Sequence, residues 1–199
     1  MISLASPEAL YPLVRESISG ALDFMIRRAL IETAVEFCRQ SQLVQSTIGP
    51  VSVEAGDSVL LVPADQPYQG RQLIRVFGEE VQPGKEPPQL RAGIDYLQLS
   101  GNELRVNRNF DGFTVVFVVE PRLTATTIPQ ILIDDYPQAL ACGAVSRMAA
   151  KTGKAWSNSQ LAAQMKPYFV EGYRDAYRWR LENTLFNSFQ NPVIKQEFF

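Results

Sequence analysis

The chain has 199 residues, of which 46% are apolar and 20% are charged, and its formal net charge is −2. This composition is typical of a globular protein with a sizeable core, whereas a general nucleic-acid or membrane binder is usually more basic. The sequence contains no histidine, which excludes histidine-dependent hydrolase triads, histidine general bases and most zinc sites, but leaves chemistry with paired carboxylates or lysine open.

The first 19 residues show neither the basic leader nor the apolar stretch of a signal peptide, and no window of the chain approaches the roughly 20 apolar residues of a membrane span. We therefore expect a protein made in the cytoplasm, with no membrane partner. Ser6 before Pro7 and Glu8 predicts a capped helical turn, which Pro12 should end soon afterwards. This segment is expected to lie as a strap on the body of the protein.

A helix of about 20 residues is predicted from Gly20, because the run GALDFMIRRALIETAVEFCRQSQ is rich in helix formers and free of proline. Helical spacing gives it two apolar stripes on nearly opposite sides. A second stripe means either that the helix is sandwiched between elements of its own chain or that it contacts a neighbouring subunit. The candidate subunit interface consists of four residues of this second stripe: Phe24, Ile31, Val35 and Cys38.

The two cysteines, Cys38 and Cys142, both lie in apolar helical patterns. This position predicts two buried thiols in a reducing compartment. The sequence has no CxxC motif, no cluster of cysteine and histidine, and neither of the glycine-rich nucleotide motifs GxGxxG and GxxxxGK[ST]. We therefore expect no metal, no cofactor and no catalytic residues.

A β domain is predicted over residues 46–129, where eight of the thirteen prolines fall and short apolar runs alternate with turn signals. The run 113–119 is apolar on both faces and should be the central strand of a small antiparallel sandwich or barrel. The proline-rich stretch 82–89 should form a loop at its rim. The strand candidates are 51–53, 58–62, 72–78, 95–100, 103–107 and 113–119.

Helical periodicity returns after residue 129, with Asp134 or Asp135 as the predicted N-cap and Pro137 in the first turn. The two aspartates are the most conspicuous acidic pair in the chain, but a carboxylate at a helix N-terminus is favoured by the free amides there. We interpret them as caps. Gly153 is expected to end this helix.

The last helix is predicted over residues 158–185, with Ser157 and Gln160 at the spacing of a capping box and a kink at Pro167. It is unusually rich in aromatic residues. Such rings usually belong to a core, but together with the arginines of the same helix they could instead face another protein.

The predicted fold class is therefore α+β: an α-helical bundle, made of one long N-terminal helix plus two C-terminal helices, with an inserted small antiparallel β-sandwich or barrel. The bundle comprises residues 1–45 and 130–186, and the inserted β domain comprises residues 46–129. We expect residues 187–199 to form an extended C-terminal arm, because Asn191 and Pro192 end any helix and leave apolar side chains exposed. The alternative is a frayed end with stray apolar residues.

The order of these parts resembles the head-to-tail adaptor (connector) proteins of tailed bacteriophages. The resemblance rests on a pattern between the β insertion and the last helix, AL-x-x-GA-x-x-R-x-x-x-x-x-G-K-x-WSN-x-x-L-A. Its positions here are Ala139, Leu140, Gly143, Ala144, Arg147, Gly153, Lys154, Trp156, Ser157, Asn158, Leu161 and Ala162.

This resemblance implies a structural virion protein rather than an enzyme: a homo-oligomeric ring, commonly a dodecamer, located in the neck between capsid and tail. The ring would dock on the portal protein, continue the channel through which double-stranded DNA passes without sequence specificity, and carry a tail, nozzle or neck protein. The family's tail-to-portal docking implies a portal-docking arm here, with candidate residues Phe186, Phe189, Pro192, Val193, Ile194, Phe198 and Phe199.

Three alternatives compete with the adaptor. One is a tail terminator or another neck component of the same particle. Another is a cell-wall glycan hydrolase that uses two carboxylates about 5 to 10 Å apart in a cleft. The third is a cellular binding module whose β domain recognises a small ligand or glycan in a concave, aromatic-lined pocket.

Overall fold

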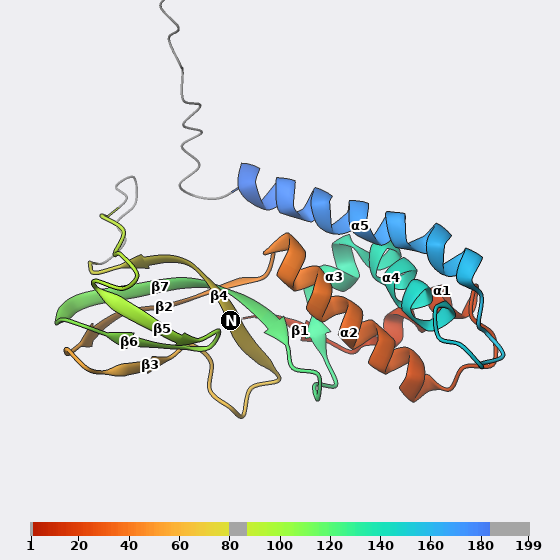
Figure 1. Cartoon of the computed structure of the whole chain (residues 1–199), viewed down its shortest axis with the longest axis horizontal. Helices are drawn as coiled ribbons and strands as arrows, with labels where there is room; N and C mark the ends of the chain where they lie inside the picture. Colours follow the sequence, from red (N-terminus) through yellow and green to blue (C-terminus); the bar gives the residue numbers. More distant parts are fainter. Residues whose placement is uncertain (1, 80–86, 184–199) are drawn as a thin grey trace, which may run out of the picture.

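The computed structural model describes residues 2–79 and 87–183, and in this part the chain is elongated, with helices at one end and the larger sheets at the other (Figure 1). The N-terminal elements are β1 (Leu4–Ala5), the 3₁₀ turn η1 (Pro7–Leu10), α1 (Tyr11–Arg15) and α2 (Asp23–Ser41). The strands that follow are β2 (Gln45–Val53), β3 (Ser58–Leu60), β4 (Tyr68–Phe77), β5 (Tyr96–Ser100), β6 (Glu103–Val106), β7 (Phe110–Pro121) and β8 (Ile128–Pro129). The C-terminal helices are α3 (Gln130–Asp135), α4 (Pro137–Ala149) and α5 (Ser159–Glu182).

The predicted fold class, a helical bundle of one long N-terminal and two C-terminal helices around one inserted sandwich, is wrong. The described residues form a mixed α/β structure with five α-helices and three antiparallel sheets. No long helix opens the chain, since a strand, a 3₁₀ turn and the short helix α1 precede α2. Pro12 does not end the N-terminal helical turn as predicted, but lies in the first turn of α1, where a missing amide donor costs nothing. Pro137 lies in the first turn of α4, as predicted.

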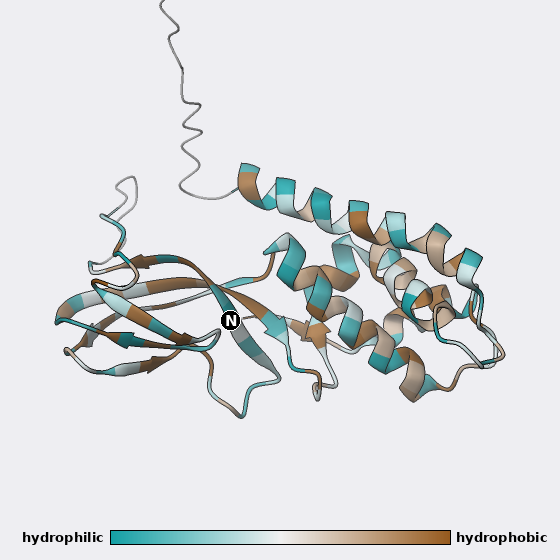
Figure 2. Cartoon of the chain, viewed as in Figure 1, coloured by the Kyte–Doolittle hydropathy of each residue, from teal (hydrophilic) through white to brown (hydrophobic). Residues whose placement is uncertain are grey.

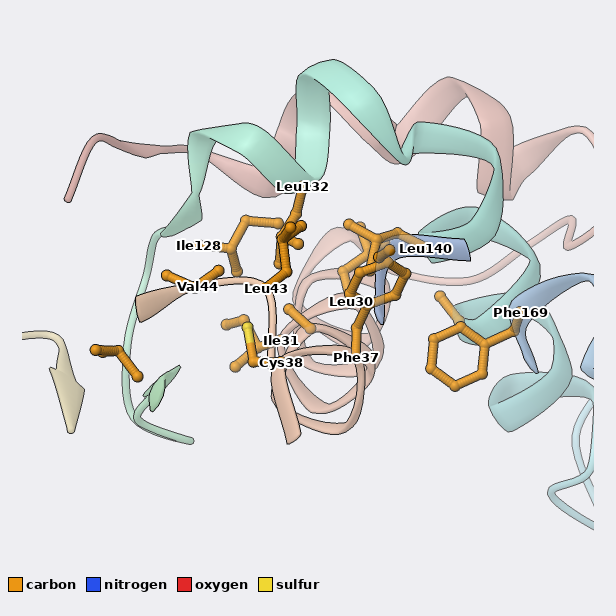
Figure 3. Packing of buried hydrophobic residues seen from close by; sticks show 14 of the residues in the cluster. Leu30, Ile31, Phe37, Cys38, Leu43, Val44, Ile128, Leu132, Leu140 and Phe169 are labelled. Carbon is orange, nitrogen blue, oxygen red and sulfur yellow. The ribbon is translucent and has the colours of Figure 1, made fainter. Parts of the chain in front are cut away.

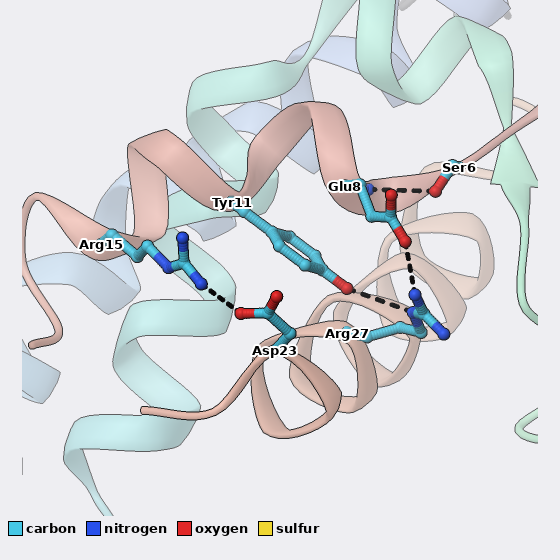
Figure 4. A network of polar contacts seen from close by, with 6 residues as sticks. All are labelled: Ser6, Glu8, Tyr11, Arg15, Asp23 and Arg27. Carbon is cyan, nitrogen blue, oxygen red and sulfur yellow. Dashed lines mark hydrogen bonds and ion pairs between the residues drawn. The ribbon is translucent and has the colours of Figure 1, made fainter. Parts of the chain in front are cut away.

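The N-terminal segment is held against α2 by polar contacts (Figure 4). Ser6 caps η1 by accepting a hydrogen bond from the Glu8 amide, as the sequence predicts. The Arg27 guanidinium donates to the Tyr11 hydroxyl at 3.1 Å and pairs with Glu8. β1 pairs with β8, which directly precedes α3, so the N-terminal segment is also bound to the start of the C-terminal helices.

The two larger sheets have the orders β2-β7-β4 and β3-β6-β5. The prediction that residues 113–119 form a central strand is confirmed, because β7 lies between β2 and β4 and is buried along most of its length. Side chains from both sheets belong to one hydrophobic core. Figure 2 shows apolar and polar residues interspersed along these strands.

Helix α2 packs against several elements of its own chain, among them α4, α5 and β7. Phe37, in the last third of α2, is fully buried, and its ring lies 6.2 Å from that of Phe169 between centroids (Figure 3). The ring of Tyr136 lies 5.1 Å from it on the same measure. The helix ends at Gln42, which adopts a left-handed conformation and donates its amide to the Cys38 carbonyl. Both apolar stripes of α2 thus contribute buried side chains to the core of one chain, whereas Phe24 at the start of the helix stays exposed.

The caps of the C-terminal helices differ from those predicted. Asp134 and Asp135 lie at the end of α3, so they do not cap α4, whose N-cap residue Tyr136 makes no side-chain capping bond. Asn158 caps α5 by accepting from the Leu161 amide at 3.0 Å, one residue later than the predicted Ser157. α5 is continuous through Pro167.

A buried ion pair joins the helices to the larger sheets. The Glu120 carboxylate at the end of β7 is fully buried and accepts hydrogen bonds from Arg39 Nε at 2.5 Å and Nη2 at 2.8 Å. Gln69 lies directly opposite on β4 and donates to the same carboxylate at 3.0 Å. Burial raises the pKa of the neighbouring Cys38 thiol, and the Glu120 carboxylate raises it further.

Replacing Arg39 should show how much this junction contributes. We expect Arg39→Met to lower the free energy of unfolding by about 2–3 kcal/mol, somewhat less than for a fully enclosed pair because Arg39 is partly exposed. Urea unfolding measures the loss. Arg28→Met is the matched control on the same helix: it breaks only the surface pair with Glu32 and should cost about 0.5 kcal/mol or less. Equal losses in the two variants would contradict this role for Glu120.

Candidate functional site

The residues that carry the phage-adaptor pattern gather where α2, α4 and α5 meet. Gly143 of α4 lies so close to its neighbours that an added Cβ would be 2.5 Å from Thr33 Cγ2 and 2.7 Å from Phe169 Cδ2. Gly172 of α5 is equally crowded, with an added Cβ at 2.3 Å from the Ala139 Cβ. Small residues at facing positions therefore let these helices approach closely.

The remaining pattern residues support the same junction. Arg147 of α4 pairs with Glu36 of α2, and Ala162 of α5 is buried while its carbonyl accepts from Ser146. In the turn between α4 and α5, Gly153 has a positive φ of 73°, a conformation that glycine adopts without strain. The pattern residues thus belong to two packed helices and the turn between them.

The outer face of α5 carries large exposed aromatic side chains. Tyr168 and Trp179 are 66% and 51% exposed, whereas Phe169 is buried in the core and Tyr173 packs against it at 5.4 Å between ring centroids. The aromatic residues of this helix therefore divide between core and surface. The Arg180 guanidinium lies 4.7 Å from the ring centre of Tyr177, in a cation–π contact.

A shallow cavity of about 460 Å³ opens beside this face, between the end of α2 and the second half of α5. Rings and guanidinium groups line it together, a combination that is enriched where proteins contact other proteins. The lining residues are Gln40, Glu171, Tyr173, Arg174, Tyr177 and Arg178.

A second hollow, of about 810 Å³, separates the α3–α4 junction from α5 and carries four exposed carboxylates, Asp134, Asp135, Glu171 and Asp175. Burial raises the pKa of the Tyr136 hydroxyl in its wall, with Asp135 and Asp175 adding to the shift. A glycosidase needs one carboxyl in apolar surroundings that keep it protonated. These four carboxylates face solvent, and Arg178 pairs with both Glu171 and Asp175. None of the four therefore has the apolar surroundings that would keep a catalytic acid protonated.

The four predicted subunit-interface residues differ in their exposure to solvent. Ile31, Val35 and Cys38 are buried inside the chain itself, where they face β7 and its surroundings. Their own chain already covers these three side chains, which does not favour a role in contact with a second subunit. Phe24, in the first turn of α2, is 61% exposed and alone of the four lies on the surface.

The predicted portal-docking arm lies outside the described residues, which end at residue 183. This concerns Phe186, Phe189, Pro192, Val193, Ile194, Phe198 and Phe199. Within residues 2–79 and 87–183, no group of three or more histidine, cysteine, aspartate and glutamate side chains is placed to hold a metal ion. No helix in these two ranges is both long and apolar enough to cross a membrane.

Sequence reasoning missed the apolar outer face of the sheet β3-β6-β5. Leu60, Leu97 and Leu99 are each about half exposed, although the alternation of YLQLS fits a strand with its leucines inside. Tyr96 takes the inward position instead, directly opposite the buried Val106. The large apolar ring of Tyr96 could have indicated this, because burying Tyr96 in an alternating strand places Leu97 and Leu99 on the opposite face.

Comparison with known proteins adds no identification. The chain matches no protein-family model, and no curated protein is significantly similar to it.

The close approach at Gly143 gives a testable prediction. Gly143→Ala should lower the free energy of unfolding by about 1–3 kcal/mol through overpacking, although alanine favours a helix over glycine by about 1 kcal/mol. Thr33→Ser removes the methyl group nearest to the new side chain but keeps a hydroxyl for the bond to the Ala29 carbonyl. We therefore expect the double variant to recover part of the loss. Chemical denaturation of both single variants and the double variant measures this coupling, and additive losses would contradict it.

Proposed function

We propose that this protein is a head-to-tail adaptor of a tailed bacteriophage. It forms a homo-oligomeric ring in the neck of the virion, docks on the portal protein, continues the DNA channel and carries the tail. The observation that carries the proposal is the junction of α2, α4 and α5, where the residues of the adaptor-like pattern meet: Gly143 at the crowded crossing, Arg147 on Glu36, and Asn158 at the start of α5.

The exposed face of α5 supports a protein partner. Tyr168 and Trp179 lie in water on a helix whose inner face already supplies the core, and large exposed rings beside arginines are typical of contact sites. α5 also leads directly into residues 184–199, which include the predicted arm. The helix face and the arm can therefore contribute to one continuous contact with the portal.

The competing functions are less well supported. The carboxylates in the α3–α5 hollow are exposed or paired with Arg178, which does not favour a glycan hydrolase. A tail terminator would bind tail protein and not portal, so portal binding separates it from the adaptor.

Portal binding is the direct test. The full chain, a chain lacking residues 187–199 and Trp179→Ala should each be co-expressed with the portal protein of the same genome, purified through a tag on the portal and imaged. We expect the full chain to form rings on the portal, the truncation to lose binding at least about tenfold, and Trp179→Ala to weaken it measurably. Because Trp179 is exposed, its replacement should leave the midpoint of thermal unfolding nearly unchanged.

Leu123→Ala is the matched control, because Leu123 is also a large exposed apolar residue but follows β7. It should bind portal like the wild type. A full-length chain that never associates with portal contradicts the adaptor function, while an equally active truncation contradicts only the docking arm.

A further inference from the structure

The sheet β3-β6-β5 ends in two strands that lack partners on their outer sides. Within the described ranges no strand continues the sheet beyond β3 or beyond β5. Only the turn that precedes β5 reaches its outer side, where the Gly93 amide donates to the Tyr96 carbonyl. Edge strands present rows of backbone donors and acceptors that can pair with another chain.

The outer face of this sheet is apolar at both edges. Leu97 and Leu99 lie on β5 and Leu60 on β3, and between them β6 presents Glu103 and Arg105. The register places Ser58 and Leu97 on either side of Arg105, so they occupy the same level of the sheet on the same face. A neighbouring copy that continues the sheet at either edge would bring Leu60 of one chain towards the leucines of the other.

The charges that flank the two edges have opposite sign. Both β3 and β5 are antiparallel to β6 and therefore parallel to each other, so their first residues lie at one end of the sheet. At this end the turn before β3 exposes Glu54 and Asp57, whereas the segment before β5 exposes Arg91. Arg108 lies at the same end and pairs with the buried Asp95.

We infer that the β5 edge of one copy pairs with the β3 edge of the next, so that this sheet continues from chain to chain. The occupant of each edge is thus a second copy of this chain, held in parallel register with Arg91 of one copy beside Glu54 and Asp57 of its neighbour. Pairing of unlike edges is a head-to-tail contact, which repeats in one direction and does not close on itself as a two-fold dimer does.

This inference deepens the proposed function, because it names the contact between neighbouring copies of the ring. Disulfide trapping tests it directly. Neighbouring strands lie about 4.8 Å apart, within reach of a disulfide. Ser58→Cys and Leu97→Cys place thiols at the same level of the two edges, in a Cys142→Ser background, while Cys38 is buried. The proteins are oxidised at high concentration and on portal.

The pattern of products distinguishes the possible contacts. A mixture of the two single variants should give a covalent dimer, the chain carrying both cysteines should give a ladder, and either variant alone should give almost none. Ser58→Cys mixed with Gln164→Cys, on the exposed face of α5, is the control and should not link. Linking within one single variant, or no linking in the mixture under either condition, overturns the inference.

Charge exchange provides a second readout in chains that keep their leucines. Arg91→Glu should lower the yield of the mixed dimer about three- to fivefold, and adding Glu54→Lys should restore it. Failure of the rescue would also overturn the inferred pairing. Rings on portal without the trapped disulfide would leave the adaptor function standing and place the ring contact elsewhere. Trapped ladders without portal binding would support the edge pairing and contradict the adaptor function.

Discussion

The buried Glu120 carboxylate fixes how the two ends of this protein meet. A carboxylate removed from water needs a counter-charge and hydrogen-bond donors, and Arg39 of α2 and Gln69 of β4 supply them. This pairing also restricts the geometry, because the planar guanidinium of Arg39 must reach the end of β7 and align with the two oxygens of the Glu120 carboxylate. The position of α2 over the strands follows from that reach.

Once α2 is placed, the packing of the other helices follows. Phe37 on its inner side defines the space into which Tyr136 and Phe169 pack. The glycines at the α4 and α5 crossings then allow α5 to lie close to α4, with one side in the core and the other in water. An aromatic outer face on α5 is therefore a separate property of the sequence, which the core does not require.

The sequence predicts regular elements well and their assembly poorly. The run 113–119 could be identified as a central strand because it is apolar on both faces, a pattern with few alternatives. The start of the chain could not be predicted correctly, since the role of Pro12 depends on whether a helix starts or ends there. The two apolar stripes of α2 could be identified from helical periodicity. Periodicity does not show which elements, or which chain, pack against each stripe. The face of β5 depends on register, which Tyr96 and its neighbour Val106 settle only in three dimensions.

The pairing of unlike edges that we infer for the sheet β3-β6-β5 has a consequence for how an assembly of copies would grow. A contact between two different surfaces has no internal end point, so the number of copies is set by the rotation between neighbours and not by the strength of the contact. A small change in that angle converts a closed ring into an open helix. A partner of fixed circular symmetry can select the closed form, because it holds each copy at the same inclination. The short, three-residue β3 suits such a template, since a weak edge adds copies reversibly and lets misplaced ones leave.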